Sequence, residues 1–189
     1  MDLEPLLLPN GDLYFLWTGQ HDGNALFIAR MSNPYTIEGD GALISAPQLD
    51  WERCGFPVNE APELLQRNGK IYLIYSASDT GTPDYCLGML TADAASNLLD
   101  PKSWVKSPKP VFSRNDAAGV FAPGHNGFFK SPDGTEDWIV YHAKTTPEYT
   151  YQGRITRAQP FHWDADGTPN FGKPVALGEP LAEPSGDAG

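Results

Sequence analysis

Asn68-Gly-Lys-Ile-Tyr-Leu-Ile-Tyr75 is a turn followed at once by aromatic and branched apolar residues, and two other parts of the chain repeat it. The repeats are Asn10-Gly-Asp-Leu-Tyr-Phe-Leu-Trp17 and Asp133-Gly-Thr-Glu-Asp-Trp-Ile-Val-Tyr141. An Asn-Gly or Asp-Gly turn supplies the positive φ that a tight hairpin needs, and bulky side chains suit a pleated strand. Each stretch therefore predicts a β-hairpin, and the turn glycines Gly11, Gly69 and Gly134 lie 58 and 65 residues apart.

The sequence after each hairpin also repeats, which extends the pattern to a larger unit. A third short apolar run follows each hairpin, at 25–31, 85–90 and 155–161, and a loop then leads to a fourth run. Four antiparallel strands in ~60 residues make one blade of a β-propeller. We therefore predict an all-β chain of the five-bladed β-propeller type with about three blades, near 2–49, 55–113 and 120–178. Residues 179–189 are expected to be a loose tail.

Two alternatives to this architecture remain at the level of the sequence. A β-sandwich of unrelated hairpins would show turn signals at similar intervals, although the long, phased repeat favours the propeller. Three blades do not close, because propellers use ~4–8. The sequence therefore predicts a missing portion, a partner that covers the open faces, or two chains that pair into a six-bladed ring.

Composition excludes several classes of protein. The 189 residues carry 13 basic and 24 acidic side chains, a net charge of −11. This balance disfavours nucleic acid and anionic membrane surfaces as partners, since both attract Lys and Arg. No apolar run reaches the ~18 residues of a membrane span, and the first five residues do not resemble a signal peptide.

Three ionisable residues occupy equivalent places in the three predicted blades. Asp2, Glu60 and His125 each lie nine residues before a turn glycine. Because the first strand of each blade lines the axis of a propeller, we expect these side chains to meet at one mouth of the channel. The alternative is that strands simply begin with polar residues at a wet mouth.

Glu60 has a local sequence that suits a general acid. Apolar neighbours, among them Phe56 and Val58, would desolvate its carboxyl group, and desolvation raises the pKa of a carboxyl group. Glu63, three residues further on, is expected by strand alternation to point to the other face. His125 lies in a glycine-rich bend, 121–127, where the backbone can approach a ligand or ion.

These residues resemble a known family of enzymes. Val58-Asn-Glu-Ala-Pro-Glu-Leu-Leu65 with the hairpin after it is similar to the general-acid blade of glycoside hydrolase family 43. Ala122-Pro-Gly-His-Asn126 and Gly153-Arg-Ile-Thr-Arg-Ala-Gln-Pro-Phe-His-Trp163 resemble its final blade. The resemblance covers about residues 1–178. It implies a five-bladed propeller and an inverting hydrolase, mainly an α-L-arabinofuranosidase, arabinanase or β-xylosidase, and 159–174 looks more like the arabinofuranosidase branches.

The resemblance also implies roles for individual residues. Glu60 matches the general acid, and Asp2 matches the aspartate that tunes and orients that acid, although the leucine after it departs from the family's small residue. His125 matches a histidine that in many members helps to hold a calcium ion, often through water. Arg154 matches an arginine that contacts the sugar, with Arg157 as the second choice.

One departure from the family concerns the catalytic base. Family members carry it as an aspartate in the first blade, whereas this chain matches the last three blades. Asp12, Asp22 and Asp40 are expected in turns or outer strands, so none is assigned as the base. We therefore expect a fragment or shortened member with little or no hydrolase activity of its own.

The implied partner is an arabinose- or xylose-containing oligo- or polysaccharide, met outside the cell. Phe56 and Phe121 are candidates for stacking on sugar faces, as are Trp51 and Tyr149, although each is typical of simple packing as well. The second hypothesis is a non-catalytic carbohydrate-binding or interaction propeller.

Overall fold

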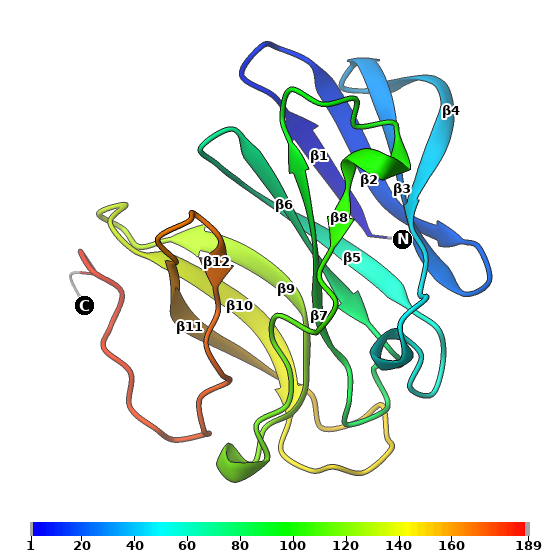
Figure 1. The fold of residues 1–189 in the computed structure, drawn as a ribbon. Helices are drawn as coiled ribbons and strands as arrows, with labels where there is room; N and C mark the ends of the chain where they lie inside the picture. The colour runs from blue at the N-terminus through cyan, green and yellow to red at the C-terminus, as the bar shows by residue number, and fades with distance from the viewer. Residues whose placement is uncertain (1, 188–189) are drawn as a thin grey trace.

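The structure, a computed structural model, describes residues 2–187 as three sheets that lie side by side, each of four antiparallel strands in chain order (Figure 1). The first sheet contains β1 (Leu3–Leu7), β2 (Leu13–Gln20), β3 (Asn24–Asn33) and β4 (Thr36–Ser45). The second contains β5 (Asn59–Arg67), β6 (Lys70–Ala77), β7 (Cys86–Asp93) and β8 (Val105–Lys106). The third contains β9 (Phe121–Lys130), β10 (Asp137–Lys144), β11 (Ile155–Trp163) and β12 (Pro169–Asn170). The predicted all-β fold with three four-stranded blades is confirmed.

The repeated turns form the hairpins that the sequence predicts. In the second blade, Asn68 and Gly69 have φ of 51° and 75°, and Arg67 pairs with Lys70 across the turn. Two consecutive positive φ angles match the right-handed twist of the strands that the turn joins. Short 3-10 turns cover Asp50–Glu52 (η1) and Asp116–Ala118 (η3) between the blades, and Pro101–Ser103 (η2) between β7 and β8 of the second blade.

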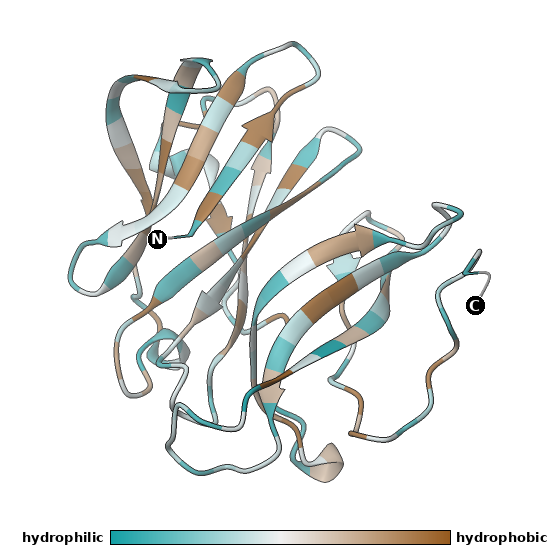
Figure 2. Cartoon of the chain, turned by 180° about the vertical axis from the view of Figure 1, so that it is seen from behind, coloured by the Kyte–Doolittle hydropathy of each residue, from teal (hydrophilic) through white to brown (hydrophobic). Residues whose placement is uncertain are grey.

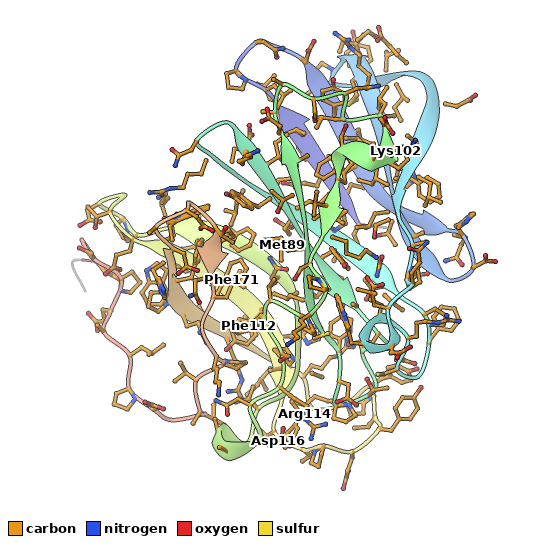
Figure 3. The ribbon with its side chains drawn as sticks, viewed as in Figure 1. Met89, Lys102, Phe112, Arg114, Asp116 and Phe171 are labelled. Atoms are coloured by element: carbon orange, nitrogen blue, oxygen red, sulfur yellow. The ribbon has the colours of Figure 1, made fainter. Side chains whose placement is uncertain are left out.

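Strand β6 is buried on both faces because it lies in the middle blade. Leu73 belongs to the core between the first and second blades, together with Leu6, Leu16 and Ile28. Ile74, the next residue, belongs to the core between the second and third blades, which includes Met89, Phe112 and Phe171 (Figure 3). Burying one such side chain stabilises the fold by about 1.5–3 kcal/mol. These two cores fix how the blades stack.

The outer face of the first blade carries an aromatic stripe, which we define as Phe15, Trp17 and Phe27. The ring centroids of Phe15 and Trp17 are 6.1 Å apart, and those of Trp17 and Phe27 are 5.6 Å apart. All three side chains are half-buried; Phe15 and Trp17 flank the fully buried Leu16 along β2, and Phe27 of β3 pairs with Trp17. Figure 2 shows the hydropathy of each residue along the strands of the three sheets.

The segment after residue 178 was expected to be a loose tail, which stays a prediction. It contains no helix or strand up to residue 187, but Ser185 fixes it to the third blade. The Ser185 hydroxyl donates to Asp133 Oδ2 at 2.5 Å, and its amide donates to Glu136 Oε2 at 3.0 Å. Across residues 2–187 no helix is long and apolar enough to cross a membrane.

Candidate active site

The structure brings together Asp2, which directly precedes β1, the backbone beside Glu60 in β5, and His125 in β9. Asp2 Oδ2 accepts hydrogen bonds from the Ala61 amide at 3.3 Å and from Thr18 Oγ1 at 3.2 Å. Asp2 Oδ1 lies 3.7 Å from His125 Nε2. The meeting of three blades at one point is therefore present, while the chemical roles of these residues stay predictions.

The backbone around this point adopts conformations that are uncommon for residues with a Cβ. Ala61, Ala122 and His125 have φ of 50°, 51° and 52°. Holding a residue in such a conformation costs about 1–3 kcal/mol of folding free energy, and residues in strained conformations cluster at functional sites. At Ala61 the strand has a bulge, a feature that re-aims side chains next to active sites.

The bulge also changes the expected direction of Glu63. Glu60 pairs with Ser76 and Glu63 pairs with Ile74, so three residues of β5 span two residues of β6. The prediction that Glu63 points to the face opposite Glu60 is wrong, because it assumed regular alternation. An extra residue in one strand shifts every later side chain by one position.

Glu60 is held by two side chains that the sequence did not single out. The Tyr85 hydroxyl donates to Glu60 Oε1 at 2.7 Å, and Asn24 Nδ2 donates to Oε2 at 3.1 Å. Tyr85 is fully buried, and this burial, with the negative charge of Glu60, raises the pKa of its hydroxyl well above its usual range. Tyr85 is therefore a permanent donor that fixes one oxygen of the Glu60 carboxyl group.

His142 packs behind Tyr85, and no sequence pattern indicated a place for it at the site. Its ring is parallel to that of Tyr85, within 2°, with centroids 5.5 Å apart, and it lies 6.2 Å from the ring of His125. Burial, together with the charges of Arg154 and His125, lowers the pKa of His142 to about 4. Its two ring nitrogens are buried without a hydrogen-bond partner among residues 2–187. At neutral pH this histidine is an uncharged packing surface.

The two candidate arginines lie in different places. Arg154 is exposed, and its positive charge acts on His142, which places it on the side of the site. Arg157 instead donates to the Val175 carbonyl at 3.0 Å, and it pairs with Tyr141 rather than His142. The geometry therefore separates two residues that the sequence left as first and second choice.

Phe56 and Phe121, the two aromatic residues predicted to stack on sugar, differ in their exposure. Phe56 is 47% exposed and lines a pocket of about 320 Å³ that also contains Glu60 and Asp79. Phe121 is buried, and the guanidinium group of Arg114 lies 5.0 Å above its ring. Phe56 is open to a ligand, whereas Phe121 packs inside the protein.

The calcium ion predicted near His125 finds few ligands. Among residues 2–187 no group of three or more His, Cys, Asp or Glu side chains could hold a metal ion. Calcium takes six to eight oxygen ligands, and Asp2 is the carboxylate paired here with His125. The described residues therefore do not fit a calcium site by themselves, and calcium near His125 stays a prediction.

Asp12, Asp22 and Asp40, which are not assigned as the catalytic base, lie in turns or an outer strand as expected. Asp12 lies in the turn before β2, Asp22 in the turn before β3, and Asp40 in the outer strand β4. We assign no catalytic base among the described residues. Cys54 and Cys86 are free thiols.

Comparison with known proteins shows one consistent similarity. The family model of glycosyl hydrolases family 43 matches residues 2–169. An extracellular exo-α-(1→5)-L-arabinofuranosidase of Streptomyces avermitilis is 46% identical over 178 residues, and so is α-L-arabinofuranosidase 43 of Humicola insolens over 179. The crystal structure of an α-L-arabinofuranosidase from Lactobacillus brevis superimposes with a TM-score of 0.88 at 41% identity, and covers 93% of this chain and 56% of its own.

The similarity does not extend over the whole length of these relatives. In both of the first two alignments 89% of this chain matches 37% of the relative. This chain therefore spans well under half the length of those two relatives.

Proposed function

The chain belongs to glycosyl hydrolase family 43, and from this premise we propose that it carries the general-acid half of a site that hydrolyses α-L-arabinofuranosides. The substrate would be an arabinose-containing polysaccharide outside the cell, with xylose-containing chains as the second choice. The observation that carries the proposal is the Glu60 carboxyl group, which faces an open pocket and is held by Tyr85 and Asn24. Two relatives named as arabinofuranosidases support the choice of sugar.

In the proposed reaction Glu60 protonates the glycosidic oxygen as the bond to the anomeric carbon breaks. The leaving sugar departs as a neutral alcohol, and water attacks the opposite face of the arabinose ring. Inverting enzymes place the second carboxyl group, which activates this water, ~6.5–9.5 Å from the acid. Asp2 acts as a positioning residue, since it accepts a hydrogen bond from the Ala61 amide directly after Glu60. Arg154 would contact the sugar in the channel.

The acid role is tested by varying the leaving group. In a chimera, this chain replaces the matching segment of the S. avermitilis relative, and Glu60→Gln is compared with the unchanged chimera. General acid catalysis contributes ~10²–10⁴-fold, so we expect Glu60→Gln to lose that much kcat on α-1,5-arabinobiose. A dinitrophenyl arabinofuranoside needs little protonation and should lose far less. Equal losses on both substrates would contradict the acid role.

The second candidate, a carbohydrate-binding propeller without turnover, is favoured by the lack of an assigned base among residues 2–187. General-base assistance is also worth ~10²–10⁴-fold. We therefore expect the 189-residue chain alone to release arabinose from arabinobiose at close to the uncatalysed rate. Clear turnover that disappears in Glu60→Gln would show instead that the chain is a complete catalyst.

A further inference from the structure

The loop between β10 and β11 reaches over the second blade and places two tyrosines on one carboxylate. Tyr149 and Tyr151 both donate to Asp79 Oδ2, at 2.7 Å and 3.1 Å. Their ring centroids are 6.0 Å apart, and their side chains are exposed. The loop thus presents aromatic surface to solvent on a fixed support.

A buried lysine holds this loop from below. Lys144 Nζ donates to the carbonyls of Gly81, Glu148 and Thr150 at 2.6, 3.0 and 3.2 Å, and the side chain is 1% exposed. The Thr150 amide also donates to the Gly81 carbonyl at 2.9 Å. A ring that is already fixed loses little conformational freedom when a ligand binds, which favours affinity.

Glycine at position 81 lets Tyr151 lie close to the second blade. A Cβ at Gly81 would be 2.9 Å from the Tyr151 ring and 3.2 Å from Asp79 Oδ1. Gly55 makes the same allowance beneath Asp79, since its φ is +77° and a Cβ there would be 2.8 Å from Asp79 Cβ. These close approaches bring the Tyr151 ring and the Asp79 carboxylate side by side. We call the surface that these two side chains form the wall.

This wall faces the pocket that contains Glu60. Phe56, Asp79, Thr80 and Tyr151 line the pocket of about 320 Å³ together with Glu60. Asp2, His125 and Arg154 are not among the residues that line it. The pocket therefore contains Glu60 and the wall but not the cluster of Asp2 and His125.

The chemistry of the wall suits a neutral sugar. Although burial opposes it, the Gly81 amide and the two tyrosine hydroxyls hold the pKa of Asp79 below its usual range. An ionised Asp79 accepts hydrogen bonds from hydroxyl groups and repels anions. The exposed faces of Phe56 and Tyr151 offer apolar contact for the C–H face of a sugar ring.

We propose that Phe56, Asp79 and Tyr151 form the subsite for the sugar unit on the leaving-group side of the scissile bond. This assignment of the side rests on the proposed function, because Glu60 marks the glycosidic oxygen. The arabinose that is released from the non-reducing end would lie in the axial channel, and the next unit would stack on Tyr151.

The test is saturation-transfer NMR of the 189-residue chain with α-1,5-arabinobiose. We expect the protons of the reducing-end unit to receive the larger share of the saturation. Tyr151→Ala removes roughly a ring face of apolar contact, so the affinity should fall about tenfold. Tyr151→Phe keeps the ring and should keep most of the affinity. Tyr35→Ala is the matched control, because Tyr35 is an 88% exposed tyrosine in the β3–β4 turn.

Three results would overturn the subsite: no binding by the unchanged chain, equal binding by Tyr151→Ala, or saturation concentrated on the non-reducing unit. Thermal unfolding of each variant shows whether it is folded. The kinetic comparison of Glu60→Gln in the chimera is independent of these measurements. A failed acid role with a tenfold loss in Tyr151→Ala removes the catalytic proposal and keeps the sugar site, whereas the reverse pair of results removes the sugar site alone.

Discussion

Glu63 is a half-buried carboxyl group that faces a second one across the first two blades. Burial, with the negative charge of Glu4, raises the pKa of Glu63 from 4.5 to about 7. Burial likewise raises the pKa of Glu4. Both side chains come from inner strands, β1 and β5, so their ionisation affects how these strands pack.

This pair predicts a stability that depends on pH. Below pH 4.5 Glu63 is protonated in the folded and the unfolded chain, and it carries no penalty. As the pH rises from 4.5 to about 7, the unfolded chain ionises first, so folding becomes less favourable. Allowing for solvent screening, we expect Glu63→Gln to raise the free energy of unfolding by about 1–2 kcal/mol at pH 8 relative to its effect at pH 5.

Urea unfolding at pH 5 and pH 8 measures this difference. Glu183→Gln is the control, since Glu183 is an exposed carboxyl group in the segment after the last blade. A gain for Glu63→Gln that is the same at both pH values would contradict the raised pKa as its cause.

At the scale of elements, the 3-10 turn η1 connects the first two blades through Glu52. Its carboxylate is fully buried and accepts hydrogen bonds from Lys106 Nζ at 2.7 Å and from the Tyr75 hydroxyl at 2.8 Å. Asn59, directly before Glu60, donates to the same carboxylate at 3.0 Å. The start of β5 is therefore tied to this buried ion pair.

Removing the positive charge of Lys106 from this pair should strongly lower the stability of the fold. Lys106→Met leaves Glu52 buried without its counter-charge, and breaking a buried pair from one side costs about 3–5 kcal/mol. Lys70→Met is the matched control, because Lys70 and Asp93 form a pair at 3.3 Å with both side chains about half exposed. Exposed pairs are worth about 0–1 kcal/mol. Equal losses of unfolding free energy for the two variants in urea would show that the buried Lys106–Glu52 pair contributes no more to stability than the exposed pair.

At the scale of the molecule, the aromatic stripe on the first blade predicts self-association. Phe15, Trp17 and Phe27 form this stripe on β2 and β3. Their sheet lies at one end of the row of three (Figure 1). Apolar surface of this kind favours contact with another sheet. We expect sedimentation velocity to show association that increases with concentration and that Trp17→Gln weakens several-fold, while Tyr35→Gln does not. A monomer at all concentrations would contradict this expectation, and a discrete dimer would agree with two chains pairing into one ring.

The repeated hairpins and the positions of the blades could be predicted because they depend on short-range rules. Asn68-Gly69 selects its turn from local backbone angles, and the aromatic run after it selects a strand. The register nine residues before each turn glycine also located Asp2, Glu60 and His125, since equivalent strands of a repeat occupy equivalent places.

The partners of Glu60 could not be predicted in this way. Tyr85 and Asn24 are distant in sequence and come from two blades, and no motif connects them with Glu60. The bulge at Ala61 also escaped the pattern, because an extra residue changes the register without changing the composition of the strand.

The sequence by itself determined the all-β class, the three blades and the three ionisable residues at their inner strands, because turn geometry and strand periodicity are local properties. The tertiary structure alone decided that Tyr85 donates to one oxygen of the Glu60 carboxyl group, and which of the two arginines lies near the site. It also decided that Tyr151 and Asp79 line the same pocket as Glu60. These facts depend on how whole blades pack against each other, and that packing is set by the sum of many buried contacts rather than by any one stretch of residues.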